Sequence, residues 1–192
     1  MCIISSIYLE LQKESDSVEI EQVKENSNDK EKFIEYVKED GLLLEWASLE
    51  LQDDKALVLE AVKSDGGALE FASDRLKDDK DVLLAAVEVK GWVLCYASET
   101  LRDDKDVVLK AAKRDGQILY YASQKLRDDK DVVLEAVTNK GIILKYASKR
   151  LREDKDVAIA AIKQNKKAFS YIADELKSDE DIQNIINPPA ND

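Results

Sequence analysis

The sequence repeats itself every 25 residues without an insertion, and this period limits the possible fold more than any other feature. Residues 101–125 read LRDDKDVVLKAAKRDGQILYYASQK, and the same pattern recurs before and after them. A fixed period of this length is typical of stacked repeats, in which each unit contacts mainly its neighbours. Three columns that keep the register are an aspartate, a glycine and an aromatic column: Asp29, Asp54, Asp79, Asp104, Asp129, Asp154 and Asp179; Gly41, Gly66, Gly91, Gly116 and Gly141; Trp46, Phe71, Tyr96, Tyr121, Tyr146 and Tyr171.

The first half of each unit predicts an amphipathic helix. Between residues 104 and 114 the apolar side chains recur at positions i, i+1, i+4 and i+5, which is helical spacing. These side chains are Val107, Val108, Ala111 and Ala112, and Leu109 widens the stripe. We therefore expect the helix to be covered on more than one side, with Asp103 or Asp104 capping its first turn.

The second half of the unit predicts another short helix, from about residue 117 to residue 123. We expect Gly116 to end the first helix, because a left-handed C-terminal cap costs glycine the least. Isolated helices this short are marginal in water, so the units must stack to become stable. The sequence therefore predicts an all-α fold, an α-solenoid (superhelix) of 25-residue two-helix repeats with polar terminal caps.

The register also predicts how the chain is organised. Residues 29–177 form six tandem helical repeats, residues 1–28 an N-terminal cap or decayed repeat, and residues 178–192 a C-terminal capping helix and tail. Terminal units of a stacked array need a polar outer side. Gln183 and Asn184 fit this need, because interior units place valine and leucine at these positions.

The string DDKDVVLEAVTNKGIILKYASKRLREDKDV, residues 128–157, resembles a helical repeat family catalogued as a domain of unknown function. In that family D-K-x-V-V-L-x-A-V-x-x-x-G-x-x-L-x-Y-A-S-x-x-L recurs, and the resemblance covers residues 29 to about 181. Asn165-Lys166 and Ile172-Ala173 depart from it near one end. The resemblance implies a repeat scaffold and brings no activity and no known site.

Several features indicate a cytoplasmic protein, or one delivered into a host cell if it comes from an intracellular bacterium. The chain has no apolar run near 18 residues, and its start lacks a basic leader. Cys2 and Cys95 are far apart, so a disulfide framework is not expected. The residues aligned with Cys95 are mostly polar, so we expect its thiol to face solvent.

Catalytic chemistry finds little support in the sequence. The chain has no histidine and no glycine-rich phosphate loop, so we predict no enzyme activity, no cofactor and no metal. The Asp-Asp-Lys-Asp turns are conceivable calcium ligands, but a lysine interrupts each cluster and the first aspartates stand at a helix start. Helix capping is therefore the favoured interpretation. A column of serines without a partner base is expected to pack or to bond locally to the backbone: Ser48, Ser73, Ser98, Ser123 and Ser148.

Protein binding is the predicted function, through positions that vary while their surroundings stay constant. The aromatic column allows two interpretations, core stacking or a partly exposed ladder that grips a partner. The variable columns place apolar side chains beside it, of the kind that interfaces use. The candidate partner-binding residues are Trp92, Tyr96, Cys95, Tyr120, Ile142, Lys145, Lys149 and Arg150.

The alternative is a nucleic-acid or ligand-binding helical repeat protein that uses the basic cluster between Lys145 and Arg152. The net charge of −12 argues against general nucleic-acid binding, because the neutralisation of phosphates supplies most of that affinity. Nucleic acid is therefore the less favoured partner.

Overall fold

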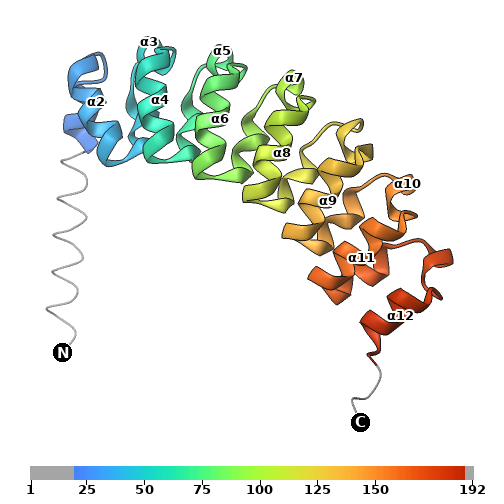
Figure 1. The fold of residues 1–192 in the computed structure, drawn as a ribbon. Helices are drawn as coiled ribbons and strands as arrows, with labels where there is room; N and C mark the ends of the chain where they lie inside the picture. Colours follow the sequence, from blue (N-terminus) through green and yellow to red (C-terminus); the bar gives the residue numbers. More distant parts are fainter. Residues whose placement is uncertain (1–19, 189–192) are drawn as a thin grey trace, which may run out of the picture.

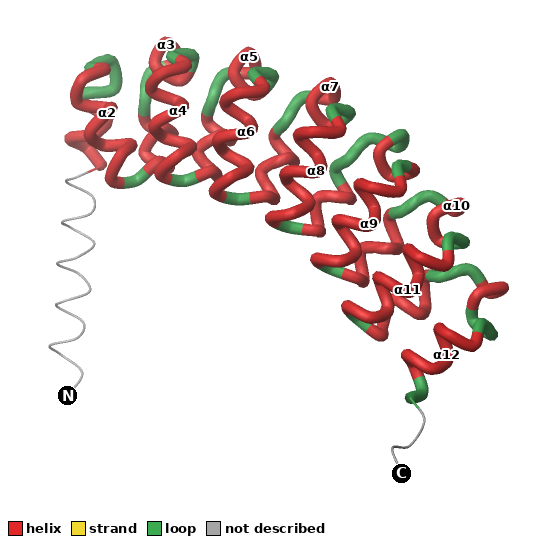
Figure 2. The backbone as a smooth tube through the Cα atoms, viewed as in Figure 1, coloured by secondary structure: helices red, strands yellow, loops and turns green. Residues whose placement is uncertain are grey.

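The computed structural model describes residues 20–188, which form an arch of stacked helical units (Figure 1). Each unit holds a ten-residue α-helix, a 3-10 helix and a one-turn helix (Figure 2). The long helices are α2 (Lys30–Glu39), α4 (Lys55–Ser64), α6 (Lys80–Val89), α8 (Lys105–Arg114), α9 (Lys130–Asn139) and α11 (Lys155–Gln164). The 3-10 helices that follow them are η1 (Gly41–Trp46), η2 (Gly66–Phe71), η3 (Gly91–Tyr96), η4 (Gly116–Tyr120), η6 (Gly141–Tyr146) and η7 (Lys166–Tyr171). The predicted all-α solenoid is confirmed.

The one-turn helices lie along the outer edge of the arch, and the turns after the long helices lie along the inner edge (Figures 1 and 2). The one-turn helices are α3 (Leu49–Gln52), α5 (Asp74–Lys77), α7 (Glu99–Arg102), η5 (Leu126–Asp128), α10 (Lys149–Arg152) and η8 (Asp174–Leu176). Residues 20–25 form a helix before the first unit, and α12 (Glu180–Ile186) follows the last. Among the helices of residues 20–188, none has the length and apolar character needed to span a bilayer.

The core is continuous along the arch because each long helix packs against the long helix before it and the one after it. In α8, the four side chains of the predicted stripe are fully buried: Val107, Val108, Ala111 and Ala112. Leu119 of the following 3-10 helix is also fully buried. Helix α8 contacts both α6 and α9, so the prediction that the helix is covered on more than one side is confirmed.

The predicted second helix, from about residue 117 to residue 123, is present, but it is a 3-10 helix and ends earlier. The chain there forms a 3-10 helix that ends at Tyr120, and the one-turn helix of the unit begins only at Leu126. The reason is a backbone contact with the preceding unit: the amide of Ser123 donates to the carbonyl oxygen of Arg102 at 3.0 Å. That amide cannot also donate within an α-helix, so the helix is interrupted there.

The serine column caps the one-turn helices. Each serine hydroxyl accepts a hydrogen bond from the backbone amide three residues later, at 3.2 to 3.4 Å. In four units the hydroxyl also donates to an aspartate of the preceding unit, namely Asp53, Asp78, Asp103 or Asp128. The predicted local bond to the backbone is therefore confirmed, and the same side chain also links neighbouring units.

The aspartate column performs two tasks with its two carboxylate oxygens. Oδ1 of Asp104 accepts from the amides of Asp106 and Val107, at 3.0 and 3.2 Å, and so caps α8. Its Oδ2 accepts from Nζ of Lys80 in the preceding unit at 2.7 Å. Equivalent ion pairs, at 2.5 to 2.9 Å, join the other units: Lys30–Asp54, Lys55–Asp79, Lys105–Asp129, Lys130–Asp154 and Lys155–Asp179. Helix capping is confirmed, with Asp104 as the cap.

The glycine column has a different role from the one expected. No residue between 20 and 188 has a positive φ, so Gly116 is not a left-handed cap. A Cβ atom at this position would lie 2.3 Å from the carbonyl oxygen of Ala136 in the next long helix. Glycine is required because the backbones of neighbouring units approach too closely for any side chain.

Replacing Gly116 by alanine should destabilise the fold by about 3 kcal/mol, because the added methyl forces two backbones apart. The matched control is Gly67→Ala. There the new methyl would meet the carboxylate of Asp65 at 3.0 Å and Leu42 at 3.5 Å, and other units carry residues as large as Trp92 in this column. Urea denaturation followed by circular dichroism should show a large loss only in the first variant. Equal losses would contradict the close-approach explanation.

Acid should weaken the stack through the aspartate column. The hydrogen bond from Lys80 lowers the pKa of Asp104, while partial burial opposes this and the Val107 amide adds to it. Lys30 lowers the pKa of Asp54 in the same way. A carboxylate with a lowered folded-state pKa stabilises the fold above its unfolded pKa of about 4, and this contribution is lost as the pH falls through the folded-state value. We expect the free energy of unfolding to fall from about pH 5 to about pH 3.

The variant Asp104→Asn with Asp129→Asn should reduce this pH dependence, because asparagine can still cap but forms no ion pair. Asp74→Asn with Glu99→Gln removes the same charge from exposed positions and should leave the slope unchanged. Urea denaturation at several pH values measures both slopes. If the free energy of unfolding of the first variant depends on pH as strongly as that of the wild-type protein, groups other than Asp104 and Asp129 cause the acid sensitivity.

Candidate functional site

The 3-10 helices present aromatic side chains at the surface. The side chains of Trp92 and Tyr120 are 40% and 54% exposed. The Trp92 ring packs edge-on against Tyr96 with centroids 5.8 Å apart. The Tyr120 ring lies 5.0 Å from Tyr121 and 5.0 Å from Tyr146 of the next unit. The contact between Tyr120 and Tyr146 therefore joins the rings of two successive units.

The aromatic column combines features of its two predicted interpretations, core stacking and a partly exposed ladder. All six rings are half-buried and pack against the core, yet each keeps part of its surface open. Tyr96 also donates a hydrogen bond to Glu70 of the preceding unit at 2.8 Å. Burial, aided by this bond and the Glu70 charge, raises the pKa of Tyr96 to about 12, so its hydroxyl stays a donor at neutral pH. The column both stabilises the stack and contributes to its surface.

Side chains of the first units lie close to Trp92 in the middle of the arch. Leu42 and Trp92 are about 40% exposed and lie on either side of Gly67, which is buried. A Cβ at Gly67 would be 3.5 Å from Leu42 and 3.7 Å from Trp92. Trp92 then shares a hollow with Tyr121 of the next unit. We call the surface formed by these residues and their neighbours the aromatic face: Leu42, Gly67, Trp92, Tyr96, Tyr120, Tyr121 and Tyr146.

Two other predicted site residues are less exposed than the pattern indicated. Ile142 is half-buried. Cys95 is also half-buried, so its thiol faces solvent only in part. The equivalent positions in the other units are exposed: Glu45, Glu70, Tyr120, Lys145 and Ser170. Burial raises the pKa of the Cys95 thiol, which keeps it protonated at neutral pH.

Three side chains of the predicted basic cluster are engaged by contacts within the chain, whereas the fourth, Arg152, has an Nε without a partner. Nε of Arg150 lies 3.1 Å from Asp128. Nζ of Lys149 lies 3.6 Å from Glu153. Lys145 lies over the ring of Tyr146 at 4.7 Å from its centroid. These contacts reduce the positive charge that the cluster can offer to a partner.

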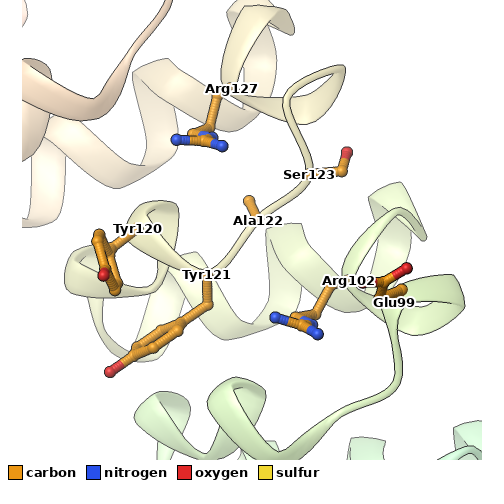
Figure 3. A pocket seen from close by; sticks show the side chains of 7 residues that line it. All are labelled: Glu99, Arg102, Tyr120, Tyr121, Ala122, Ser123 and Arg127. Carbon is orange, nitrogen blue, oxygen red and sulfur yellow. The ribbon is translucent and has the colours of Figure 1, made fainter.

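A second surface feature, which sequence reasoning missed, is a row of hollows at the junctions between units. Each hollow lies between an arginine of one unit and the aromatic residue of the next, and we call them the arginine hollows. They are formed by Arg102 with Tyr121, Arg127 with Tyr146, and Arg152 with Tyr171. The first has a volume of about 480 Å³. Figure 3 shows Arg102 and Arg127 with Ala122 between them and with Tyr120 and Tyr121 to one side.

The arginines of these hollows differ from the other arginines of the chain. Arg75, Arg114 and Arg150 each form an ion pair with a carboxylate of the preceding unit. In the described part of the chain, the hollow arginines form no ion pair. Their Nε atoms are shielded from solvent and have no hydrogen-bond partner: Arg102, Arg127 and Arg152. A buried donor without a partner costs about 1 to 3 kcal/mol, so these Nε atoms do not add to the stability of the fold.

A sequence signal for the hollows exists in one column of the repeat. Five of its six positions are basic: Gln52, Lys77, Arg102, Arg127, Arg152 and Lys177. The first member, Gln52, uses its side-chain amide to cap the carbonyls of Leu44 and Glu45. Only the three-dimensional arrangement distinguishes the arginines with free hydrogen-bonding capacity from the paired ones.

The aspartate clusters are engaged by amides and lysines, as described above. Within residues 20–188, no group of three or more histidine, cysteine, aspartate or glutamate side chains is placed to hold a metal ion.

The fold and its period define an α-solenoid in which an aspartate column and an aromatic column run through all six units and a glycine column through the first five. The family described as a domain of unknown function (DUF4116) matches residues 29–77, 54–102, 79–127, 104–152 and 129–177. These overlapping matches each span two units and together cover most of the chain. The protein therefore belongs to this family. No curated protein and no solved structure matches the chain.

Replacing Arg127 by methionine should leave the free energy of unfolding unchanged, or raise it by about 1 kcal/mol, because a buried unpaired donor is removed and the apolar stem is kept. The matched control is Arg150→Met, which breaks the ion pair with Asp128 and should cost up to about 1 kcal/mol. Urea denaturation of both variants checks the difference. A loss of about 2 kcal/mol or more at Arg127 would give its guanidinium group a structural role.

Proposed function

We propose that this domain is a non-catalytic scaffold that binds a protein partner through its aromatic face. The observation that carries the proposal is the exposure of Trp92 and Tyr120, 40% and 54%, at positions that vary among otherwise constant units. Tryptophan and tyrosine supply much of the binding energy in protein interfaces, because they bury a large area and lose little side-chain freedom.

The rigidity of the stack supports the same proposal. The aromatic rings rest on fully buried residues such as Leu94 and Leu119, and neighbouring units are joined by ion pairs and backbone hydrogen bonds. A partner therefore meets a surface that is already ordered, which lowers the entropic cost of binding. The aromatic face continues over several units, as an extended interface requires.

The charges favour a protein over a nucleic acid as the partner. The chain carries a net charge of −12, and the contacts of Lys149 and Arg150 with carboxylates weaken the late basic cluster. We also propose a cytoplasmic location, and the free thiol of Cys95 fits a reducing compartment.

Capture of partners from a lysate tests the proposal. The immobilised wild-type domain should retain a protein that survives nuclease treatment. Trp92→Ala with Tyr120→Ala should reduce its capture at least tenfold, because two exposed anchors of about 2 kcal/mol each are lost. The apolar control is Leu49→Ala, which removes an 84% exposed side chain from the outer edge of the arch and should have no effect.

Two outcomes would contradict the proposal. The first is that every captured partner is lost on nuclease treatment. The second is that capture survives the aromatic substitutions but fails in Lys149→Glu with Arg150→Glu, which would move the site to the basic cluster.

A further inference from the structure

We infer that the arginine hollows bind an extended acidic peptide of the partner, with one carboxylate entering each hollow. This inference rests on the proposed function, because it names the chemistry of a protein segment that lies beside the aromatic face. Tyr121 lines both surfaces, so they are continuous.

The first argument is the hydrogen-bonding capacity of the hollows. The guanidinium groups of Arg102, Arg127 and Arg152 have no carboxylate partner within residues 20–188, and their Nε donors are unused. Within the same chain, Arg75 binds the carboxylate of Asp53 through Nε, at 3.0 and 3.2 Å to its two oxygens. A terminal nitrogen of Arg75 also donates to the main-chain oxygen of Asp53, at 2.6 Å, so the guanidinium group is held by several N–H donors at once. Because no bond anchors Nε of the hollow arginines, a ligand carboxylate can draw these groups into the same arrangement.

The second argument is local charge. The hollow between Arg127 and Tyr146 is lined by Arg127 and Lys149 and by no carboxylate. The flanking hollows contain acidic residues next to the arginines, namely Glu99 in one and Glu153, Asp174 and Glu175 in the other. A nucleic acid carries a phosphate at every residue and would be repelled by these carboxylates. A peptide can place its negative charges opposite the arginines alone.

The third argument is spacing. Packed helices lie about 8 to 10 Å apart. The arginines stand on the one-turn helices of the outer edge (Figure 1), so the hollows of neighbouring units are at least this far apart. A polyproline II peptide rises about 3.1 Å per residue with three residues per turn, so every third side chain points the same way at about 9 Å intervals. The half-buried tyrosine in each hollow adds the aromatic surface on which such peptides pack. An acidic residue at every third position is therefore the shortest regular pattern that the hollows can accept.

Fluorescence anisotropy with a labelled (EPP)4 peptide tests this inference. The wild-type protein should bind the probe, whereas (QPP)4 should not bind. A peptide of the same composition with its four glutamates in one block should bind at least fivefold more weakly, because only one hollow is then filled. No binding of (EPP)4, or equal binding of the block peptide, would overturn the inference.

The decisive variant is Arg102→Gln with Arg127→Gln and Arg152→Gln, which should weaken binding of (EPP)4 at least tenfold. The matched control is Lys38→Gln with Lys113→Gln and Lys163→Gln. It removes the same charge from exposed positions at the ends of long helices and should change binding less than twofold. Circular dichroism should show the same helix content in both variants. If both variants weaken the binding of (EPP)4 equally, net charge alone explains the effect and the inference is overturned.

Two further arms separate this inference from the function on which it rests. A single-stranded DNA oligonucleotide should not displace the peptide at equal concentration, and displacement would assign the hollows to nucleic acid instead. If the triple arginine variant still captures the lysate partner while Trp92→Ala with Tyr120→Ala does not, the inference fails and the proposed function stands.

Discussion

The structure depends on one close approach between neighbouring units. At the inner edge of the arch, each glycine of the column leaves no room for a Cβ, because the carbonyl oxygen of the next long helix lies 2.1 to 2.9 Å from where it would be. This contact brings the backbones together, so that small and branched side chains such as Val108 and Ala112 are fully buried between helices. The stack therefore has one continuous core, although no unit has a core of its own.

The outer edge is held by polar side chains instead. Each aspartate caps its own long helix with one oxygen and binds the lysine of the preceding unit with the other, as Asp104 does with Lys80. Each serine likewise caps a one-turn helix. Backbone hydrogen bonds also join the units at this edge, as the amide of Ser123 does with the carbonyl oxygen of Arg102. These contacts recur along the array, which forms the arch of Figure 1.

This division of roles leaves the variable positions free of structural duties. The core, the caps and the lysine–aspartate pairs recur in every regular unit, so a change at Trp92 or Tyr120 alters the surface without altering the frame. The arginines of the hollows differ from these variable positions, because their unpaired Nε donors lower the stability of the fold. Natural proteins accept such costs at functional sites. The aromatic face and the arginine hollows together form a surface with both apolar anchors and selective charges.

The sequence by itself determined the solenoid, its period, the helix-capping aspartates and the buried stripe of each long helix, because all of these follow from local spacing. It could not determine the role of Gly116, since the carbonyl of Ala136 that excludes a side chain belongs to another unit. For the same reason the sequence predicted a second helix as far as residue 123, whereas the 3-10 helix ends at Tyr120, because the amide of Ser123 donates to Arg102 of the preceding unit. Trp92 and Tyr120 could be selected as surface candidates from their column. Only the tertiary structure separated Arg127 from Arg150, because whether a guanidinium group finds a carboxylate depends on which side chains meet across the junction between units.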